Sequence, residues 1–300
     1  GIKQTAWLNI LFTSLEAGGL ILITLMGIKY IGKVDLLQTA SGVPGVLSAA
    51  SLIFFAYIGF EAVVKLSEET KNATKIIPKA LILSIIISTI LYMLVAVASI
   101  SILGWEKLSA STAPLADVAQ AVLGSKAFLL LAIIALFSTA NTVLMIMVTT
   151  SRLMYGMATE YSKIKVLSYI SKKRKTPLIA ILVTMIITIF FALLGDLRLV
   201  AEMSNFAIFA AFIIINISLI KLRYSAPQLK RPFRVPLAIG KFPIFPFLGI
   251  ISSLFMITNL TFDVIIGGIV LIIVCYLTYY AVKKEVPKRI MRRIKKKRKI

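Results

Sequence analysis

The sequence predicts an all-α, polytopic membrane protein, and three observations lead to this fold class. Of its 300 residues 59% are hydrophobic, and the mean hydropathy is +0.95. The apolar residues form runs of about 17–28 residues, and one helical crossing of a bilayer needs roughly 20. Positive charge is concentrated in alternate connections between these runs. We therefore expect a single membrane domain over residues 1–300 with eight transmembrane helices, at about 7–28, 45–66, 80–103, 127–154, 178–194, 200–222, 244–260 and 264–282.

The charge distribution also predicts an orientation. If the connections alternate between the two sides of the membrane, 29 of the 34 Lys and Arg fall on one side and five on the other. Cytoplasmic connections carry the excess of Lys and Arg, so we expect a multi-pass protein of the cell membrane with both termini in the cytoplasm. The basic cytoplasmic tail, residues 283–300, is expected to contact anionic lipids, and we expect no nucleic-acid binding.

The residues that are absent exclude several kinds of chemistry. The sequence has no histidine, and its single cysteine, Cys275, lies within an apolar run. These two facts exclude histidine proton relays, Ser-His-Asp catalysis, an intramolecular disulfide and the common metal-binding motifs. We therefore expect no metal site, no cofactor and no catalytic residues, and the sequence disfavours an enzyme.

Four connections between the runs are longer than the rest: residues 29–44, 104–126, 155–177 and 223–243. Part of the second, Asp117–Leu123, is amphipathic and predicts a short interfacial helix. The last contains four prolines, a density that predicts an ordered loop rather than a helix.

Two acidic residues lie deep in apolar runs: Glu16 in the first and Glu61 in the second. Charged residues inside a membrane are rare, and they face the interior of the helix bundle or water. One interpretation of each acid is a functional site, and the other is a hydrogen bond that packs two helices together.

The second run also contains a candidate helix interruption. Gly59 directly precedes Phe60 and Glu61, and glycine permits a break at which backbone groups turn towards a ligand. We expect non-helical backbone at about residues 56–59. The aromatic residues Phe54, Phe55 and Tyr57 could close over a small solute, although aromatic residues in membrane helices more often serve packing.

Polar residues also cluster in the fourth run, within FSTANT. Their hydroxyl groups could bond back to their own helix, or the cluster could line a cavity or an ion path. The residues of this cluster are Ser138, Thr139, Asn141 and Thr142. In the sixth run we expect Ser204, Asn205 and Asn216 to bridge neighbouring helices.

Three segments resemble the amino acid–polyamine–organocation (APC) superfamily of permeases. They are FFAYIGFEAVVKLSEETKNATKIIPKA, FSTANTVLMIMVTTSRLMYGMATE and LRYSAPQLKRPFRVP, in the order and spacing of that family. The resemblance implies a partial LeuT-like inverted-repeat fold in which this chain corresponds to helices five to twelve. It also implies the C-terminal part of a twelve-helix permease, that is, a fragment or the product of a truncated gene.

The resemblance also implies roles for individual residues. Substrate binding and gating are implied for the segment around the break, and coupling to an ion is implied for residues of the first and fourth runs. The substrate-binding and gating residues are Phe55, Ala56, Ile58, Gly59 and Glu61, and the coupling-ion candidates are Glu16, Ser138, Thr139 and Asn141.

The function that the resemblance implies is secondary active transport of amino acids or related amines by alternating access. The coupling ion, a proton or sodium, stays open, as does the choice between uniport, symport and antiport. The alternative is a non-transporting truncated remnant or a partner subunit, and a membrane-embedded enzyme ranks below both.

Overall fold

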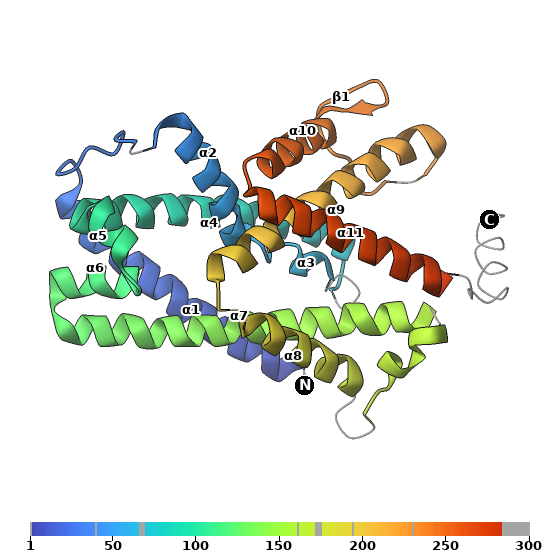
Figure 1. Ribbon diagram of the computed structural model, residues 1–300, viewed down its shortest axis with the longest axis horizontal. Coiled ribbons are helices and arrows are strands. Elements are labelled where there is room, and N and C mark those ends of the chain that lie inside the picture. The colour runs from blue at the N-terminus through green and yellow to red at the C-terminus, as the bar shows by residue number, and fades with distance from the viewer. Residues whose placement is uncertain are drawn as a thin grey trace. The chain divides into compact units, whose positions relative to one another are not determined.

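The computed structural model is almost entirely helical, as the sequence predicts (Figure 1). It forms two compact units, which are described separately: unit 1 is Gly1–Gln38 with Ala80–Thr149, and unit 2 is Thr39–Lys79 with Thr150–Ile300. The structure describes residues 2–39, 41–65, 70–160, 162–171, 176–193, 195–229 and 231–283.

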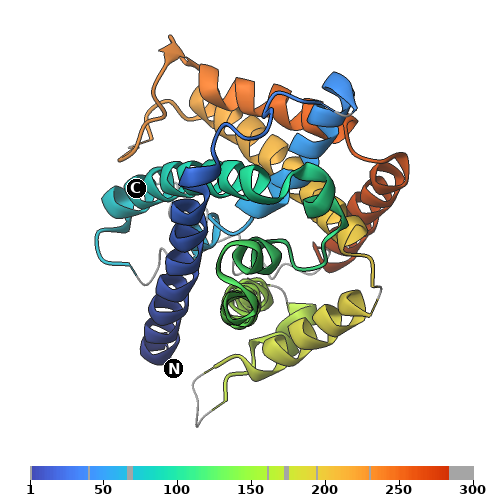
Figure 2. The same cartoon turned by 90° about the vertical axis from the view of Figure 1, so that its left-hand side faces the viewer.

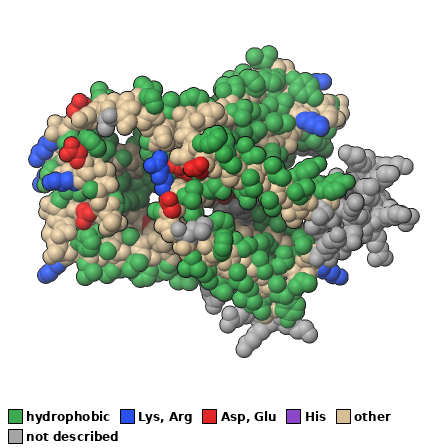
Figure 3. Space-filling model, in the orientation of Figure 1, with side chains coloured by type: hydrophobic (Ala, Val, Ile, Leu, Met, Phe, Trp, Pro, Cys, Tyr) green, Lys and Arg blue, Asp and Glu red, His purple; other side chains and the backbone are tan. Residues whose placement is uncertain are grey.

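Among the residues that the structure describes, five helices are long and apolar enough to cross a membrane. At most 17% of each apolar stretch is buried within the protein, so these helices leave large hydrophobic side chains for lipid to cover. Figure 3 shows hydrophobic side chains over much of the visible face. The fold is therefore that of an all-α polytopic membrane protein. The five helices are α1 (Ile2–Gly27), α4 (Ala73–Leu103), α7 (Ser125–Glu160), α9 (Leu197–Ser225) and α11 (Phe262–Lys283).

Three of the expected membrane spans fall on shorter helices. They are α2 (Gly42–Ile53), which continues into the 3-10 helix η2 (Phe54–Tyr57), α8 (Leu178–Ala192) and α10 (Ile244–Thr258). A helix of 15 residues is about 22 Å long, which is less than the thickness of a typical hydrocarbon core. The number of crossings therefore stays a prediction.

Unit 1 packs around small and aliphatic side chains. The short helix α6 (Pro114–Leu123) lies alongside the first part of α7 (Figure 1, Figure 2). Its buried face, which includes Val118 and Ala119, joins a core with residues of α1, α4 and α7. This helix contains the segment predicted as amphipathic. Two further short helices complete the described part of unit 1: η1 (Ile28–Tyr30) and α5 (Trp105–Ala110).

Two helices of unit 1 approach each other very closely. A Cβ atom added to Gly27 of α1 would lie 2.2 Å from the Cβ and 2.5 Å from the Cα of Ala98 in α4. Because both residues are small, the two backbones can come together at this point.

Unit 2 is organised around α9, which packs against α2, α10 and α11. Phe206 and Phe209 of α9 form its core with Leu260 and Val264, and the Phe54 ring lies 4.7 Å from that of Phe209. The remaining elements of unit 2 are α3 (Ala62–Lys65), η4 (Ser162–Ser168) and an antiparallel hairpin of β1 (Ala238–Ile239) and β2 (Phe242–Pro243).

The proline-rich connection is an ordered loop where the structure describes it, as predicted. Helix α9 continues to Ser225, and the hairpin then leads directly into α10. The Arg231 guanidinium donates hydrogen bonds to four backbone carbonyls, at distances of 2.9–3.2 Å. It thereby ties the end of α9 to the loop that follows. The four carbonyls belong to Leu222, Ala226, Pro227 and Leu229.

Candidate functional site

The second apolar run is interrupted, which confirms the predicted break. The α-helix ends at Ile53, a 3-10 turn follows over Phe54–Tyr57, and Ile58 has extended backbone with φ −66° and ψ 127°. Gly59 then adopts φ +129°, a conformation that L-residues with a side chain rarely adopt. The structure therefore places the non-helical residues slightly later than the sequence predicts, because Ala56 still belongs to the 3-10 turn.

Glu61 lies at this break and contacts its backbone. One carboxylate oxygen, Oε2, accepts a hydrogen bond of 2.8 Å from the Gly59 N–H. Helix α3 begins at the next residue, so the carboxylate holds the turn between the two helical pieces. Of the other predicted site residues here, Phe55 and Ala56 are exposed and Ile58 is half-buried.

Two of the predicted coupling-ion residues come together in unit 1. The Ser138 hydroxyl on α7 donates a hydrogen bond to Oε1 of Glu16 on α1. Beside this contact, the ring of Phe12, one turn before Glu16, stacks on the ring of Phe137, the residue before Ser138, with the centroids 5.3 Å apart. An aromatic and a polar contact thus add to the apolar core that α1 and α7 share.

The other two predicted coupling-ion residues behave differently from each other. Thr139 is exposed, and its hydroxyl donates to the Ala135 carbonyl of its own helix at 2.9 Å, which is the first of the two alternatives for this cluster. Asn141 is only 5% exposed and lies three residues after Ser138, on the same side of α7. Its buried Oδ1 has no hydrogen-bond partner within the part of the chain that the structure describes.

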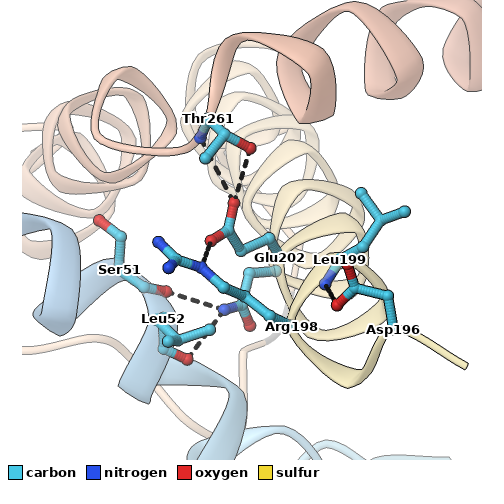
Figure 4. Close-up of polar contacts among 8 residues, drawn as sticks. Ser51, Leu52, Asp196, Arg198, Leu199, Glu202 and Thr261 are labelled. Carbon is cyan, nitrogen blue, oxygen red and sulfur yellow. Dashed lines mark hydrogen bonds and ion pairs between the residues drawn. The ribbon is translucent and has the colours of Figure 1, made fainter.

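Sequence reasoning missed Glu202 in unit 2, which is buried, whereas Glu16 and Glu61 are half-buried. Glu202 is 3% exposed, and its carboxylate accepts from Arg198 Nε at 2.8 Å and from the Thr261 hydroxyl at 2.9 Å (Figure 4). The Thr261 N–H approaches the same carboxylate at 3.4 Å, directly before α11 begins. Glu202 lies near the start of the sixth apolar run. The criterion that selected Glu16 and Glu61, a position deep within a run, therefore did not select it. The one available signal was Arg198 four residues earlier, a spacing that suits an ion pair on a helix.

The predicted bridging role is confirmed for Asn205 and wrong for Ser204. The Asn205 side-chain amide donates to the carbonyls of Ser51 at 2.8 Å and of Leu52 at 3.2 Å, both on α2 (Figure 4). The Ser204 hydroxyl instead donates to the Val200 carbonyl of its own helix. Asn216 faces α10, because a Cβ atom added to Gly249 would lie 2.8 Å from its Nδ2.

Residues 1–282 match a protein family described as "Amino acid permease". The chain is similar to the branched-chain amino acid permease BcaP of Bacillus subtilis (strain 168), with 31% identity over 247 residues, or 81% of this chain and 52% of the relative. It is also similar to the methylthioribose transporter of the same organism, with 27% identity over 79% of this chain and 51% of the relative. The b(0,+)-type amino acid transporter 1 of Mus musculus is 28% identical over 85% of this chain and 53% of the relative. The chain thus spans about half the length of the curated relatives that it matches.

Proposed function

Because the chain belongs to the amino acid permease family, we propose that it forms part of a secondary active transporter for amino acids or related amines. The chain is a multi-pass membrane protein and not an enzyme. In this proposal it supplies the C-terminal part of a twelve-helix permease that works by alternating access. The observation that carries the proposal is the interrupted helix between Ile53 and Ala62.

An interrupted helix suits a small zwitterionic or amine substrate. Non-helical backbone at membrane depth is tolerated only where protein buries it or where it lines a cavity. In transporters such breaks lie near the substrate, because their backbone groups can bind carboxylate, ammonium or small cations. Here Phe55, Ala56, Ile58 and Gly59 would contact the substrate, and Glu61 would hold the turn and respond to its occupancy.

The Glu16 and Ser138 pair is our candidate for the coupling-ion site. A carboxylate, a hydroxyl and the Asn141 amide oxygen are oxygen ligands, which suit a proton or a hard cation such as sodium. Two observations support this assignment. Ser138 donates to Glu16, and the Asn141 oxygen is buried without a partner among the described residues.

Uptake measurements test the transport proposal. The chain would be placed in proteoliposomes, alone and together with the N-terminal half of the related branched-chain permease, and supplied with labelled branched-chain amino acids or methylthioribose. We expect uptake of an amino acid in at least one arrangement. No uptake by correctly inserted protein in either arrangement would leave the alternative role, a non-transporting remnant or partner subunit.

Four substitutions locate the site within an active protein. We expect Gly59→Ala to abolish uptake, because alanine cannot adopt a φ of +129° without strain. Gly156→Ala is the matched control, since a Cβ atom there meets nothing within 4 Å.

Glu61→Gln should lower net uptake more than substrate binding, and Glu16→Gln should change the pH or sodium dependence. If Glu61→Gln transports at the wild-type rate with unchanged pH dependence, its role is packing alone.

The proposed topology has eight crossings and both termini in the cytoplasm. It rests on the separation of positive charge. Single cysteines at positions 107 and 173, in a Cys275→Ser background, test this orientation in intact cells. An impermeant thiol reagent should label position 107 and not position 173. Labelling of position 173 and not of position 107 would show that the orientation is the opposite of the one proposed.

A further inference from the structure

The last turn of α2 is held by side chains from two other helices of unit 2. The Asn205 amide of α9 donates to the Ser51 and Leu52 carbonyls. The Ser51 hydroxyl donates to the Met256 carbonyl of α10 at 3.1 Å and lies 3.4 Å from the Met256 sulfur. Both Ser51 and Asn205 are completely buried. These contacts lie directly before the residue at which the α-helix ends.

The position of these hydrogen bonds has a physical reason. The last four carbonyls of an α-helix have no partner within that helix, and a buried carbonyl without a partner is costly in a membrane. Here the Phe54 N–H reaches the Ala50 and Leu52 carbonyls, and the Asn205 amide reaches those of Ser51 and Leu52. After Ile53 the backbone changes to 3-10 geometry, which weakens the regular ladder of hydrogen bonds at this point. An asparagine amide carries two N–H donors, and here they reach two successive carbonyls of the changing turn.

Residues of α9 on either side of Asn205 fix the position of this part of the helix. Glu202, three residues earlier on α9, binds Thr261 at the start of α11. Phe209, one turn later on α9, packs against Phe54, the first residue of the 3-10 turn. The turn of α9 around Asn205 is therefore fixed to α11 and to η2.

From these contacts we infer that Asn205 is a positioning residue, which sets where the α-helical part of α2 ends and thereby where the interrupted segment Phe54–Glu61 lies. Its two donors stabilise the 3-10 turn relative to a continuous α-helix, because a continuous helix would take up the Ser51 and Leu52 carbonyls itself. The consequence for substrate binding rests on the proposed transport function. The positioning itself does not depend on transport.

A thiol-accessibility experiment on the whole chain tests this positioning. The reporter is Ala56→Cys in a Cys275→Ser background, because Ala56 is exposed and lies in the 3-10 turn. We expect Asn205→Ala and Asn205→Asp each to change the rate of modification about fivefold, the factor that corresponds to one net hydrogen bond. Alanine is the sharper variant, because it has no donor, whereas aspartate keeps the size of asparagine and, when protonated, one O–H donor. Ser204→Ala is the matched control, since that hydroxyl bonds its own helix.

The outcomes separate a positioning role from simple packing. Rates within twofold of the parent for both Asn205 variants would overturn the inference, as would an equal change with Ser204→Ala. If both variants fail to insert into the membrane, insertion of the Asn205→Gln variant tests the inference instead. Glutamine keeps two donors, so restored insertion supports the inference and continued failure overturns it.

A second measurement separates this inference from the proposed function. In a transporting protein, Asn205→Asp should raise the KM for substrate severalfold while the maximal rate per inserted protein changes less. A protein that transports nothing would contradict the proposed function, and the accessibility result would still decide the role of Asn205.

Discussion

The two units hold their helices together by different means. In unit 1 the described helices meet through small and aliphatic side chains, with Gly27 of α1 almost touching Ala98 of α4. Among the described residues, the Ser138 hydroxyl also donates a hydrogen bond to the Glu16 carboxylate, between α7 and α1. In unit 2 polar side chains reach from helix to backbone: Asn205 to α2, Ser51 to α10 and Glu202 to the start of α11.

The kind of contact depends on whether the helices are continuous or interrupted. An unbroken helix satisfies its own backbone, so its contacts with neighbours in a membrane depend on close packing of small residues. The interrupted second run and the start of α11 expose backbone groups inside the protein. Those groups need donors or acceptors from other helices, and α9 supplies them. Four substitutions test this contrast.

The largest loss of stability is expected from Gly27→Ala. The new methyl group would overlap backbone and Cβ atoms of Ala98, which cannot rotate away. Overpacking of this kind costs about 1–3 kcal/mol and more where the backbone must move. Denaturant titration in detergent micelles measures the change. Gly18→Ala on the same helix meets nothing within 4 Å and should leave the protein as stable or stabilise it. Equal behaviour of the two variants would contradict close packing of α1 against α4.

Replacement of Glu202 by alanine should give the next largest loss, about 1.5–3 kcal/mol, because hydrogen bonds to a buried charged group are removed. Glu202→Gln should lose much less, since an amide oxygen can still accept from Thr261. The Arg198 side chain is 62% exposed, so solvent screens its ion pair with Glu202. Glu106→Gln, at an exposed position of α5, is the control. If glutamine costs as much as alanine, the ion pair and not the contact with α11 stabilises this turn.

Arg231→Lys should have a moderate and local effect of about 1 kcal/mol. A lysine ammonium cannot reproduce the planar fork that reaches four carbonyls at once. We expect faster hydrogen exchange over residues 222–229, measured by mass spectrometry on the protein in detergent. Arg234→Lys, at an exposed position of the same loop, should leave exchange there unchanged. Unchanged exchange in both variants would show that the hydrogen bonds of Arg231 do not order the loop.

Ser138→Ala should have the smallest effect on stability, roughly 0.5–1 kcal/mol, because it removes one hydrogen bond between two half-buried side chains. Thr139→Val is the neighbouring control, because that hydroxyl bonds its own helix and its loss breaks no contact between α1 and α7. Denaturation midpoints of the two variants give the comparison. A greater loss from Thr139→Val than from Ser138→Ala would contradict the pairing with Glu16.

Much of the architecture follows from the sequence because its signals are local. Long apolar runs predict membrane helices regardless of their neighbours, and within the described ranges five of them form helices long enough to cross a bilayer. Gly59 beside Glu61 predicted the interruption, since only glycine adopts the observed φ without strain. Glu16 and Ser138 stood out as polar residues within apolar surroundings, and the structure pairs them.

Other features depend on partners far away in the sequence, and the tertiary structure alone decided them. Glu202 is buried because Thr261, 59 residues later, brings the start of α11 against it. Asn205 acquired its role from carbonyls 154 and 153 residues earlier, which become acceptors where α2 changes geometry. Ser204 and Asn205 are both polar and adjacent, yet they point to different sides of one helix. The packing of the helices determines which side of α9 faces a neighbour, and the hydropathy of the sequence does not predict it.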